Sequence, residues 1–505
     1  MRRKSRSGSH EAAAATAVRV SGAAALALLP AQAAAHAFGA RYDLPLPLSL
    51  WLAGAGLAVA LSFVVFALAL RPGDASFSYP RLDVLRLPGA RLVAHPFVLE
   101  SLRALSAGIF LVVIAAGLFG NQDPFRNLAP AFVWIAWWIG FTYLSAGAGD
   151  LWALLNPWNT FSVWAEALAR KVRTAPSGGL ERTLAPGVGV WPAVLLLLAF
   201  AWLEIVWAGN EIPFNIAALA LGYSVLTWSG MFVFGREEWL RSGEVFAVYF
   251  GLLARLAPTE VRTSSAAAPA RLEWNLRPPG AGLLDARCAS TSSAFFVIVM
   301  LATVTFDGAR ETPLWAGLLA RASQPGEPVS DLLWSASATA GLLLGPCVFA
   351  LVILGASALM AWLTRGDARP ASAGELARLF VPTLLPIAFA YHVAHYLSYL
   401  LVAGQVVIPL ASDPFGRGWD LFGTSHYRVA VGIVGARFAW YTSVVVIVLG
   451  HVLAMYAAHR LALARFSEPR TARRSQYPLA ALMVAYTMLS LWILAQPIVE
   501  AGPAK

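Results

Sequence analysis

Charge and cysteine are both scarce in this chain of 505 residues. Only 13% of the residues are charged, against about 25% in a typical soluble domain, whereas 58% are hydrophobic. This composition excludes a soluble globular protein and indicates one that crosses a membrane several times. Two cysteines, Cys288 and Cys347, are too few for a disulfide framework. The sequence also contains no CxxC pair, no Gly-rich phosphate motif and no internal repeat.

Lysine is almost absent, so arginine carries the formal net charge of +10. A basic balance can indicate nucleic-acid binding. Here, however, the arginines lie in segments between apolar runs, where the preference of basic residues for the cytoplasmic side explains them better. We therefore expect no nucleic-acid partner, and the lipid bilayer is the expected environment.

The first 35 residues are typical of a secretory signal peptide. MRRKSRSGSH is basic, VSGAAALALLP is a short apolar core, and AQAAAHA supplies small residues at the spacing that signal peptidase accepts. Cleavage after Ala35 leaves His36 as the first mature residue, and cleavage after Ala37 fits nearly as well. We predict a signal peptide over residues 1–35 and a mature amino terminus outside the cytoplasm.

Residues 36–505 contain about ten apolar segments that approach the length of roughly 20 residues needed to cross a bilayer. With the amino terminus outside, the Arg-rich loops fall on the inner side, as the positive-inside rule requires. The sequence predicts an all-α protein, a single transmembrane bundle with both termini outside the cytoplasm. The expected spans are 47–70, 102–120, 129–147, 189–209, 213–234, 289–306, 337–363, 379–403, 436–460 and 478–499, and the expected inner loops lie near 71–101, 148–188, 235–288, 364–378 and 461–477.

Three stretches of the inner loops have distinct compositions. LWALLNPWNTFSVWAEALARKVR and REEWLRSGEVFAVYFGLLAR are rich in aromatic residues and end in basic ones, which predicts two amphipathic helices at the membrane surface. Residues 258–287 contain SSAAAPA and RPPGAG, which predict a flexible loop.

Titratable residues inside the expected spans are candidates for a functional site, because ionisable groups are costly within a bilayer. His392 and His395 lie one turn apart in AYHVAHYLS, and His451 lies in the next span. Side chains at i and i+3 share a helix face, which is how helix bundles present metal ligands. We predict that the three histidines bind a divalent transition metal: zinc, manganese, cobalt or copper. Packing roles, or axial ligation of a haem by His392 and His451, are the alternatives.

Two carboxylates are expected on the same, outer side of the bundle: Glu204 in FAWLEIV and Asp307 in VTFDG. Both are candidate catalytic groups, because a carboxylate can position an attacking water or accept its proton. Alternatively, Glu204 caps a helix or pairs with an arginine such as Arg310 or Arg417. As the first mature residue, His36 would offer a two-nitrogen chelate suited to copper, although a histidine also arises near a cleavage site by chance.

Blocks that cover most of the mature chain in order resemble the bacterial multi-pass membrane proteins known as fenitrothion hydrolases. They include AHAFGARYDLPLPL, NLAPAFVWIAWW, LNPWNTF, FGREEWLRSGEVFAVYFGLLARLAP, SDPFGRGWDLFGT and GHVLAMYAAH. The resemblance implies a protein of the bacterial inner membrane that hydrolyses an organophosphorothioate triester and releases a nitrophenol. It assigns no catalytic residue.

Three functions therefore stay open at the level of sequence. The first is an integral membrane, metal-dependent hydrolase of organophosphate triesters, in which a bound metal supplies hydroxide and the substrate is an apolar small molecule. The second is a protein that transports or inserts a transition metal such as copper, with His36 as the capturing residue. The third is a haem-binding redox subunit. A second membrane subunit could join any of them.

Overall fold

The computed structural model describes residues 44–70, 79–172, 182–264, 271–284, 289–323 and 328–496. Within these ranges the chain is mainly helical, and nine helical segments are long and apolar enough to cross a membrane. The all-α, membrane-spanning fold predicted from the sequence is confirmed. The nine segments are α2 (Leu48–Ala69), α3 (Pro96–Phe119), Leu128–Ala148, α9 (Pro213–Phe234), α12 (Thr291–Arg310), α14 (Asp331–Leu363), Ala373–Ser412, α18 (Ala436–Arg465) and Pro469–Ala495.

Each of the ten expected spans corresponds to a helix. The remaining one is α8 (Trp191–Ile205), which has 15 residues and is shorter than the other nine. The predicted signal peptide, its cleavage sites and His36 lie outside the described residues, so they stay predictions, as does the orientation of the bundle in the membrane.

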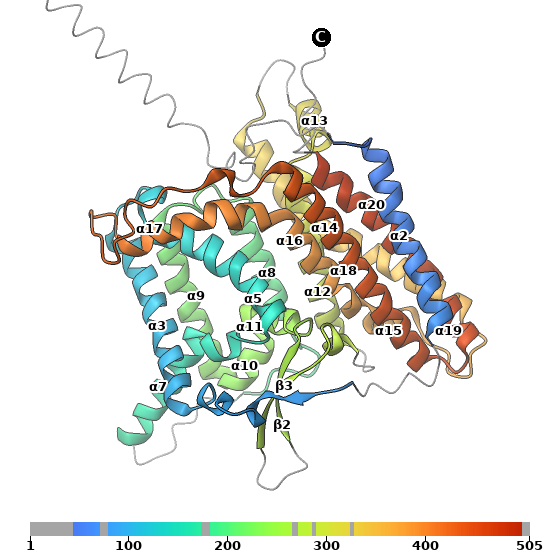
Figure 1. Cartoon of the computed structure of the whole chain (residues 1–505), viewed down its shortest axis with the longest axis horizontal. Coiled ribbons are helices and arrows are strands. Elements are labelled where there is room, and N and C mark those ends of the chain that lie inside the picture. The colour runs from blue at the N-terminus through green and yellow to red at the C-terminus, as the bar shows by residue number, and fades with distance from the viewer. Residues whose placement is uncertain are drawn as a thin grey trace, which may run out of the picture.

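The helices form two flanks (Figure 1). α2 and α18 pack against α20 (Tyr477–Ala495) on one flank, and α3 packs against α9 on the other. α12, α8 and α16 (Leu385–Val402) lie between the flanks. The α16–α18 contact is close at Gly450, where an added Cβ would meet the Cβ of Ala390 at 2.5 Å.

The span Leu128–Ala148 is not a uniform α-helix. It consists of α4 (Leu128–Pro130), a π-helix labelled η7 (Ala131–Ile139) and α5 (Gly140–Ala148). The span Ala373–Ser412 is similarly divided into α15 (Ala373–Phe380), η9 (Val381–Leu384), α16, η10 (Ala403–Val406) and α17 (Val407–Ser412). π-Helical turns in a helix often lie at functional sites, and this one carries the adjacent residues Trp137 and Trp138.

One of the two predicted surface helices is instead part of the core. The stretch from residue 236 forms α10 (Arg236–Ser242) and α11 (Val245–Leu253), and α11 packs against α5 and α8 inside the bundle. Phe250 and Val245 are fully buried. The surface prediction is wrong for α11 because VFAVYFGLL has no polar face, and a helix that is apolar all round is stable only when it is buried.

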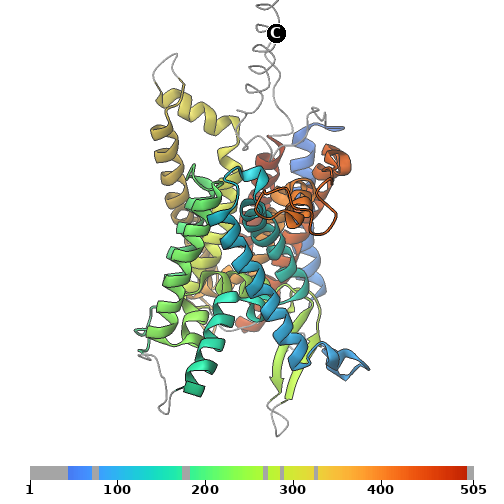
Figure 2. The same cartoon turned by 90° about the vertical axis from the view of Figure 1, so that its left-hand side faces the viewer.

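The other predicted surface stretch forms α6 (Trp152–Leu155) and α7 (Pro157–Val172). The start of α7 is buried at Trp158, whereas its far end exposes Leu168 and Val172. The helix therefore joins the bundle at one end and projects from it at the other, as Figure 2 shows.

The predicted flexible loop at 258–287 contains a β-hairpin. β2 (Thr259–Ser264) pairs antiparallel with β3 (Arg271–Leu276), with Thr259 opposite Leu276, and β1 (Leu82–Asp83) pairs with the other edge of β3. The sheet lies at the end of the bundle opposite α13 (Pro313–Ala322) and α17; we call these the hairpin end and the α13 end (Figures 1 and 2).

Ion pairs hold this sheet together. Glu260 on β2 lies 2.5 Å from Arg81, which precedes β1, and 2.7 Å from Arg277, which follows β3. Partial burial acts to raise the pKa of Glu260, but the hydrogen bond from Arg81 and the charges of Arg277, Arg81 and Arg262 outweigh it and lower the pKa below its usual value.

Candidate functional site

Three polar side chains contact a buried carboxylate near the α13 end. Asp307, in the last turn of α12, is only 5% exposed. Arg310 donates a hydrogen bond from Nε to Oδ1 of Asp307 at 2.9 Å, and Nη2 of Arg310 lies 2.9 Å from the same oxygen in an ion pair. On the other carboxylate oxygen, Oδ2 lies 3.0 Å from Nε2 of His395 and accepts a hydrogen bond from the hydroxyl of Tyr396. We call these four residues the Asp307 cluster.

Local sequence places each member of the cluster. Asp307 and Arg310 are three residues apart on one helix, so they share a face. Arg310 also lies at the carboxyl end of α12, where a positive charge is favoured by the helix dipole. His395 and Tyr396 are neighbours on α16, which packs against α12. A buried carboxylate is tolerated when its charge is paired and its oxygens are hydrogen-bonded, and both conditions hold here.

The second predicted carboxylate lies close to this cluster. Glu204 is at the end of α8, and its Oε1 accepts a hydrogen bond of 2.8 Å from Nε1 of Trp138 on η7. It interacts electrostatically with Asp307 and Arg310. The alternative in which Glu204 pairs with Arg310 is not what the structure shows, because the guanidinium of Arg310 contacts Asp307 and Glu311 instead.

The three intramembrane histidines have different surroundings. His395 joins the Asp307 cluster. The ring of His392 packs against the rings of Trp138 and Tyr396, with centroids 6.4 Å and 4.8 Å away, and its Nε2 has no hydrogen-bond partner among the described residues. His451 is fully buried on α18, with Nδ1 2.8 Å from the backbone oxygen of Ile447.

Within the described ranges, no group of three or more His, Cys, Asp or Glu side chains is arranged so that it could hold a metal ion. The structure therefore pairs His395 with Asp307 but does not assemble His392, His395 and His451 into one ligand set. Whether a side chain faces a common centre depends on helix rotation and tilt, which the spacing of residues along the sequence does not determine. Metal binding by these residues stays a prediction.

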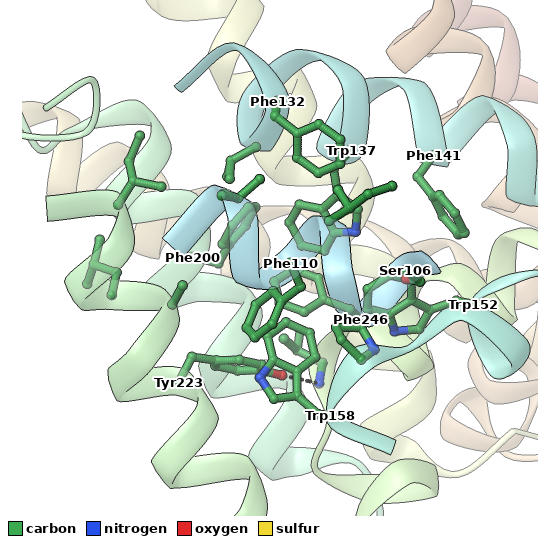
Figure 3. A pocket seen from close by; sticks show the side chains of 18 of the residues that line it. Ser106, Phe110, Phe132, Trp137, Phe141, Trp152, Trp158, Phe200, Tyr223 and Phe246 are labelled. Atoms are coloured by element: carbon green, nitrogen blue, oxygen red, sulfur yellow. Dashed lines mark hydrogen bonds between the residues drawn. The ribbon is translucent and has the colours of Figure 1, made fainter. Parts of the chain in front are cut away.

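A cavity of about 570 Å³ lies within the bundle (Figure 3). We call it the aromatic chamber. Its described lining residues come from α3, η7, α5, α6, α7, α8, α9 and α11, and no histidine, aspartate or glutamate is among them. Trp137 lines the chamber, while its neighbour Trp138 bonds to Glu204 and packs on the lining residue Phe200, with centroids 4.6 Å apart. Trp138 therefore connects the chamber wall with Glu204.

Sequence reasoning missed a second buried carboxylate, Glu244, which is 0% exposed. Its Oε1 accepts a hydrogen bond of 2.6 Å from the hydroxyl of Tyr223, and its Oε2 accepts from Nδ2 of Asn156 at 2.9 Å and Nε1 of Trp152 at 3.2 Å. It also caps α11, accepting from the backbone N–H groups of Phe246 and Ala247. The signal that could have revealed it is an acidic residue directly before a wholly apolar helix, in GEVFAVYF.

Comparison with known proteins finds no matching family model, no matching curated protein and no matching solved structure. The class of this protein is therefore assigned from its fold and its site alone. It is an all-α protein of the membrane-spanning class, with a charge-paired Asp–His–Arg cluster buried near one end of the bundle and an aromatic chamber within the bundle.

Proposed function

We propose that this protein is an integral membrane hydrolase of apolar aryl triesters of phosphoric or phosphorothioic acid, in which Asp307 and His395 activate the attacking water. The observation that supports this proposal is the 3.0 Å contact between Asp307 Oδ2 and His395 Nε2. The resemblance to fenitrothion hydrolases, noted in the sequence, suggests the substrate class.

The hydrogen bond fixes the chemistry available to the imidazole. An ionised carboxylate only accepts hydrogen bonds, so Nε2 of His395 carries a proton, and in a neutral ring Nδ1 then carries the lone pair. The side chain of His395 is 15% exposed, so that it is not fully enclosed by protein. Asp307 holds the ring in this tautomer and stabilises the imidazolium that forms when Nδ1 takes a proton.

The proposed reaction is a single displacement at phosphorus. The water oxygen forms a bond to phosphorus as its proton passes to Nδ1 of His395, and the bond from phosphorus to the aryl oxygen breaks. The aryl oxide leaves with the electron pair, and a nitrophenolate is stable enough to leave without a general acid. The guanidinium of Arg310 lies where it can stabilise negative charge that develops on the phosphoryl oxygen or sulfur.

Glu204 is the candidate second carboxylate, and we assign it to holding Trp138 at the wall of the aromatic chamber. A bound metal would supply hydroxide by a different route. Since the described side chains do not form a set of three ligands, the proposed steps involve no metal. The metal-dependent reaction predicted from the sequence is tested in the same assay by adding a chelator.

The test is nitrophenol release from fenitrothion by the purified protein in lipid nanodiscs. Asp307→Asn and His395→Gln are expected to lower the rate by about 10³-fold or more, in line with the loss of a histidine–carboxylate base in other hydrolases. His426→Gln is the matched control, because His426 is an exposed histidine away from the cluster. Absence of hydrolysis by the unaltered protein, or full activity of Asp307→Asn, would contradict the proposal. Inactivation by chelator would favour the metal-dependent reaction.

A further inference from the structure

The aromatic chamber has a lining that suits one kind of ligand. A pocket for a small molecule typically has a volume of about 300–1,000 Å³, and the chamber falls in this range at about 570 Å³. Aromatic rings from five different elements surround it: Phe110 of α3, Trp137 of η7, Trp158 of α7, Phe200 of α8 and Phe246 of α11 (Figure 3).

Most polar side-chain atoms of the described lining already bond within the protein. Nε1 of Trp158 donates to Oγ of Ser224 at 2.8 Å, the hydroxyl of Tyr223 donates to Glu244, and Oγ of Ser106 donates to the backbone oxygen of Leu155 at 2.5 Å. A charged ligand would meet no opposite charge among the described lining residues and would lose its hydration on entry. The chamber therefore suits an apolar group.

The chamber is open at the side of the bundle. Two of its lining residues, Leu105 on α3 and Leu226 on α9, are 60% and 41% exposed, so they contribute both to the cavity and to the outer surface. Gly222 on α9 also lines the chamber and is exposed. α3 and α9 are membrane spans, so their outer surface faces lipid, and the opening leads to the bilayer interior.

The packing of α3 and α9 explains the opening between them. The helices touch at Gly117, where an added Cβ would lie 2.6 Å from the backbone oxygen of Pro213. Farther along, α7 is wedged between them, because Trp158 packs on Phe110 of α3 at 5.2 Å and on Tyr223 of α9 at 4.9 Å. The chamber extends along α3 and α9 from near the touching point past Trp158, because Leu105 of α3 and Leu226 of α9 also line it, and both helices are visible on the face shown in Figure 2.

We propose that the aromatic chamber binds the aryl group of a molecule dissolved in the bilayer, which enters sideways between α3 and α9. An aryl ring fits better than a lipid acyl chain, because a lining of indole and phenyl rings offers it edge-to-face and offset-stacked contacts. A nitrophenyl ring is electron-poor and stacks well on an indole. The identity of the molecule as an aryl phosphotriester rests on the proposed function, whereas aryl binding and lateral entry do not.

One substitution fills the chamber without straining the fold. A Cβ added at Gly222 meets nothing within 4 Å, so Gly222→Leu places a side chain at the opening without a clash. Gly355 on α14 is the matched control: it is also exposed, within a membrane span and open to a Cβ, but it does not line the chamber. Equal thermal unfolding of the two variants would show that any difference in binding is local.

The probe is 4-azidophenyl diethyl phosphate, photolysed with the protein in lipid nanodiscs, and the labelled peptides are identified by mass spectrometry. We expect labels on the chamber segments around Trp137, Trp158 and Phe200. The amount of label should be at least fivefold lower in Gly222→Leu and unchanged in Gly355→Leu. An excess of a non-reactive aryl triester should suppress the labels, and oleic acid should not.

The proposal would be overturned if Gly222→Leu were labelled as strongly as the unaltered protein. It would also be overturned if oleic acid, and not the aryl triester, suppressed the labelling. Labelling needs no turnover, so it separates this proposal from that of hydrolysis. Asp307→Asn should remain fully labelled even though it does not hydrolyse the ester. If the unaltered protein is labelled in the chamber but releases no nitrophenol, the hydrolase proposal fails and aryl binding stands.

Discussion

Two buried carboxylates, Asp307 and Glu244, differ in their partners. Asp307 is paired with a guanidinium and with an imidazole that has a second nitrogen for chemistry. The described contacts of Glu244 are all with neutral donors: a phenol, an indole, an amide and two backbone N–H groups. The two carboxylates therefore differ in the kind of partner, and under the proposed function this difference separates a reactive carboxylate from a structural one.

Glu244 joins three elements that would otherwise separate. Its partners come from α6 and the residue after it, from α9 and from the first turn of α11. Because α11 packs against α5 and α8 and forms part of the chamber wall, the carboxylate holds the chamber in shape. The described partners of Asp307, by contrast, lie on α12 and α16, and two of them, Arg310 and His395, are partly exposed.

The largest expected effect on stability is therefore that of Glu244→Ala. The substitution leaves the buried donors of Tyr223, Asn156 and Trp152 without an acceptor, and we expect a loss of about 4 kcal/mol, given about 1–3 kcal/mol for each buried group left unpaired and partial relaxation. Thermal unfolding of the purified protein measures it. Glu244→Gln, which keeps one acceptor oxygen, should lose less than half as much. An alanine variant as stable as the original protein would refute the structural role.

A smaller loss is expected at the touching point of the chamber helices. Gly117→Ala forces a Cβ to within 2.6 Å of a backbone oxygen, and we expect destabilisation of about 1–3 kcal/mol. Gly108→Ala on the same helix is the control, since its Cβ meets nothing within 4 Å and alanine is the better helix former. The comparison of the two unfolding midpoints checks the prediction, and equal midpoints would show that α3 and α9 are free to separate.

His392→Gln should have a still smaller effect. The ring of His392 packs among aromatic side chains, so a glutamine of similar length should cost about 1 kcal/mol or less and preserve hydrolysis. His395→Gln, one turn away, should fold equally well but lose activity. Metal content measured on both variants sharpens the test. Parallel loss of metal and activity in the two would instead support the metal site predicted from the sequence.

The smallest effect concerns the hairpin end and depends on pH. The folded-state pKa of Glu260 is lowered, so its ion pairs stabilise the sheet above the unfolded pKa of about 4.3, and this stabilisation is lost as the pH falls through the folded pKa. Below about pH 4, the β3 amides should therefore exchange faster, relative to their intrinsic rates, than they do at higher pH. Glu260→Gln should remove this pH dependence, and an unchanged profile in that variant would contradict the explanation.

The sequence predicted the spans and part of the site for clear physical reasons. Long apolar runs must be helices in a bilayer, so the spans could be found from hydropathy alone. Asp307 and His395 could be chosen because they are titratable residues in apolar surroundings. Their pairing was not predicted, however, because it depends on how α12 and α16 are rotated against each other. The grouping of His451 with the other two histidines depends on the same kind of rotation and stays a prediction.

The elements that were misjudged lie between the spans. α11 has only nine residues, too few to cross a bilayer, and was placed at the surface although its apolar circumference requires burial. Glu244 was overlooked with it, as part of a presumed loop. The hairpin was missed because the charges that pair with Glu260 include Arg81 before β1 and Arg277 after β3, and these two contacts are distant in sequence.

The most direct test of the contrast between the two carboxylates is a measurement of kcat/KM for fenitrothion hydrolysis in Asp307→Asn and Glu244→Gln side by side, at a temperature where both are folded. We predict that Asp307→Asn unfolds like the original protein but loses about 10³-fold or more in kcat/KM. Glu244→Gln should unfold at a lower temperature while its kcat/KM stays within about threefold of the original value, a change of less than 1 kcal/mol. An inactive Glu244→Gln together with an active Asp307→Asn would contradict the assignment of chemistry to the Asp307 cluster.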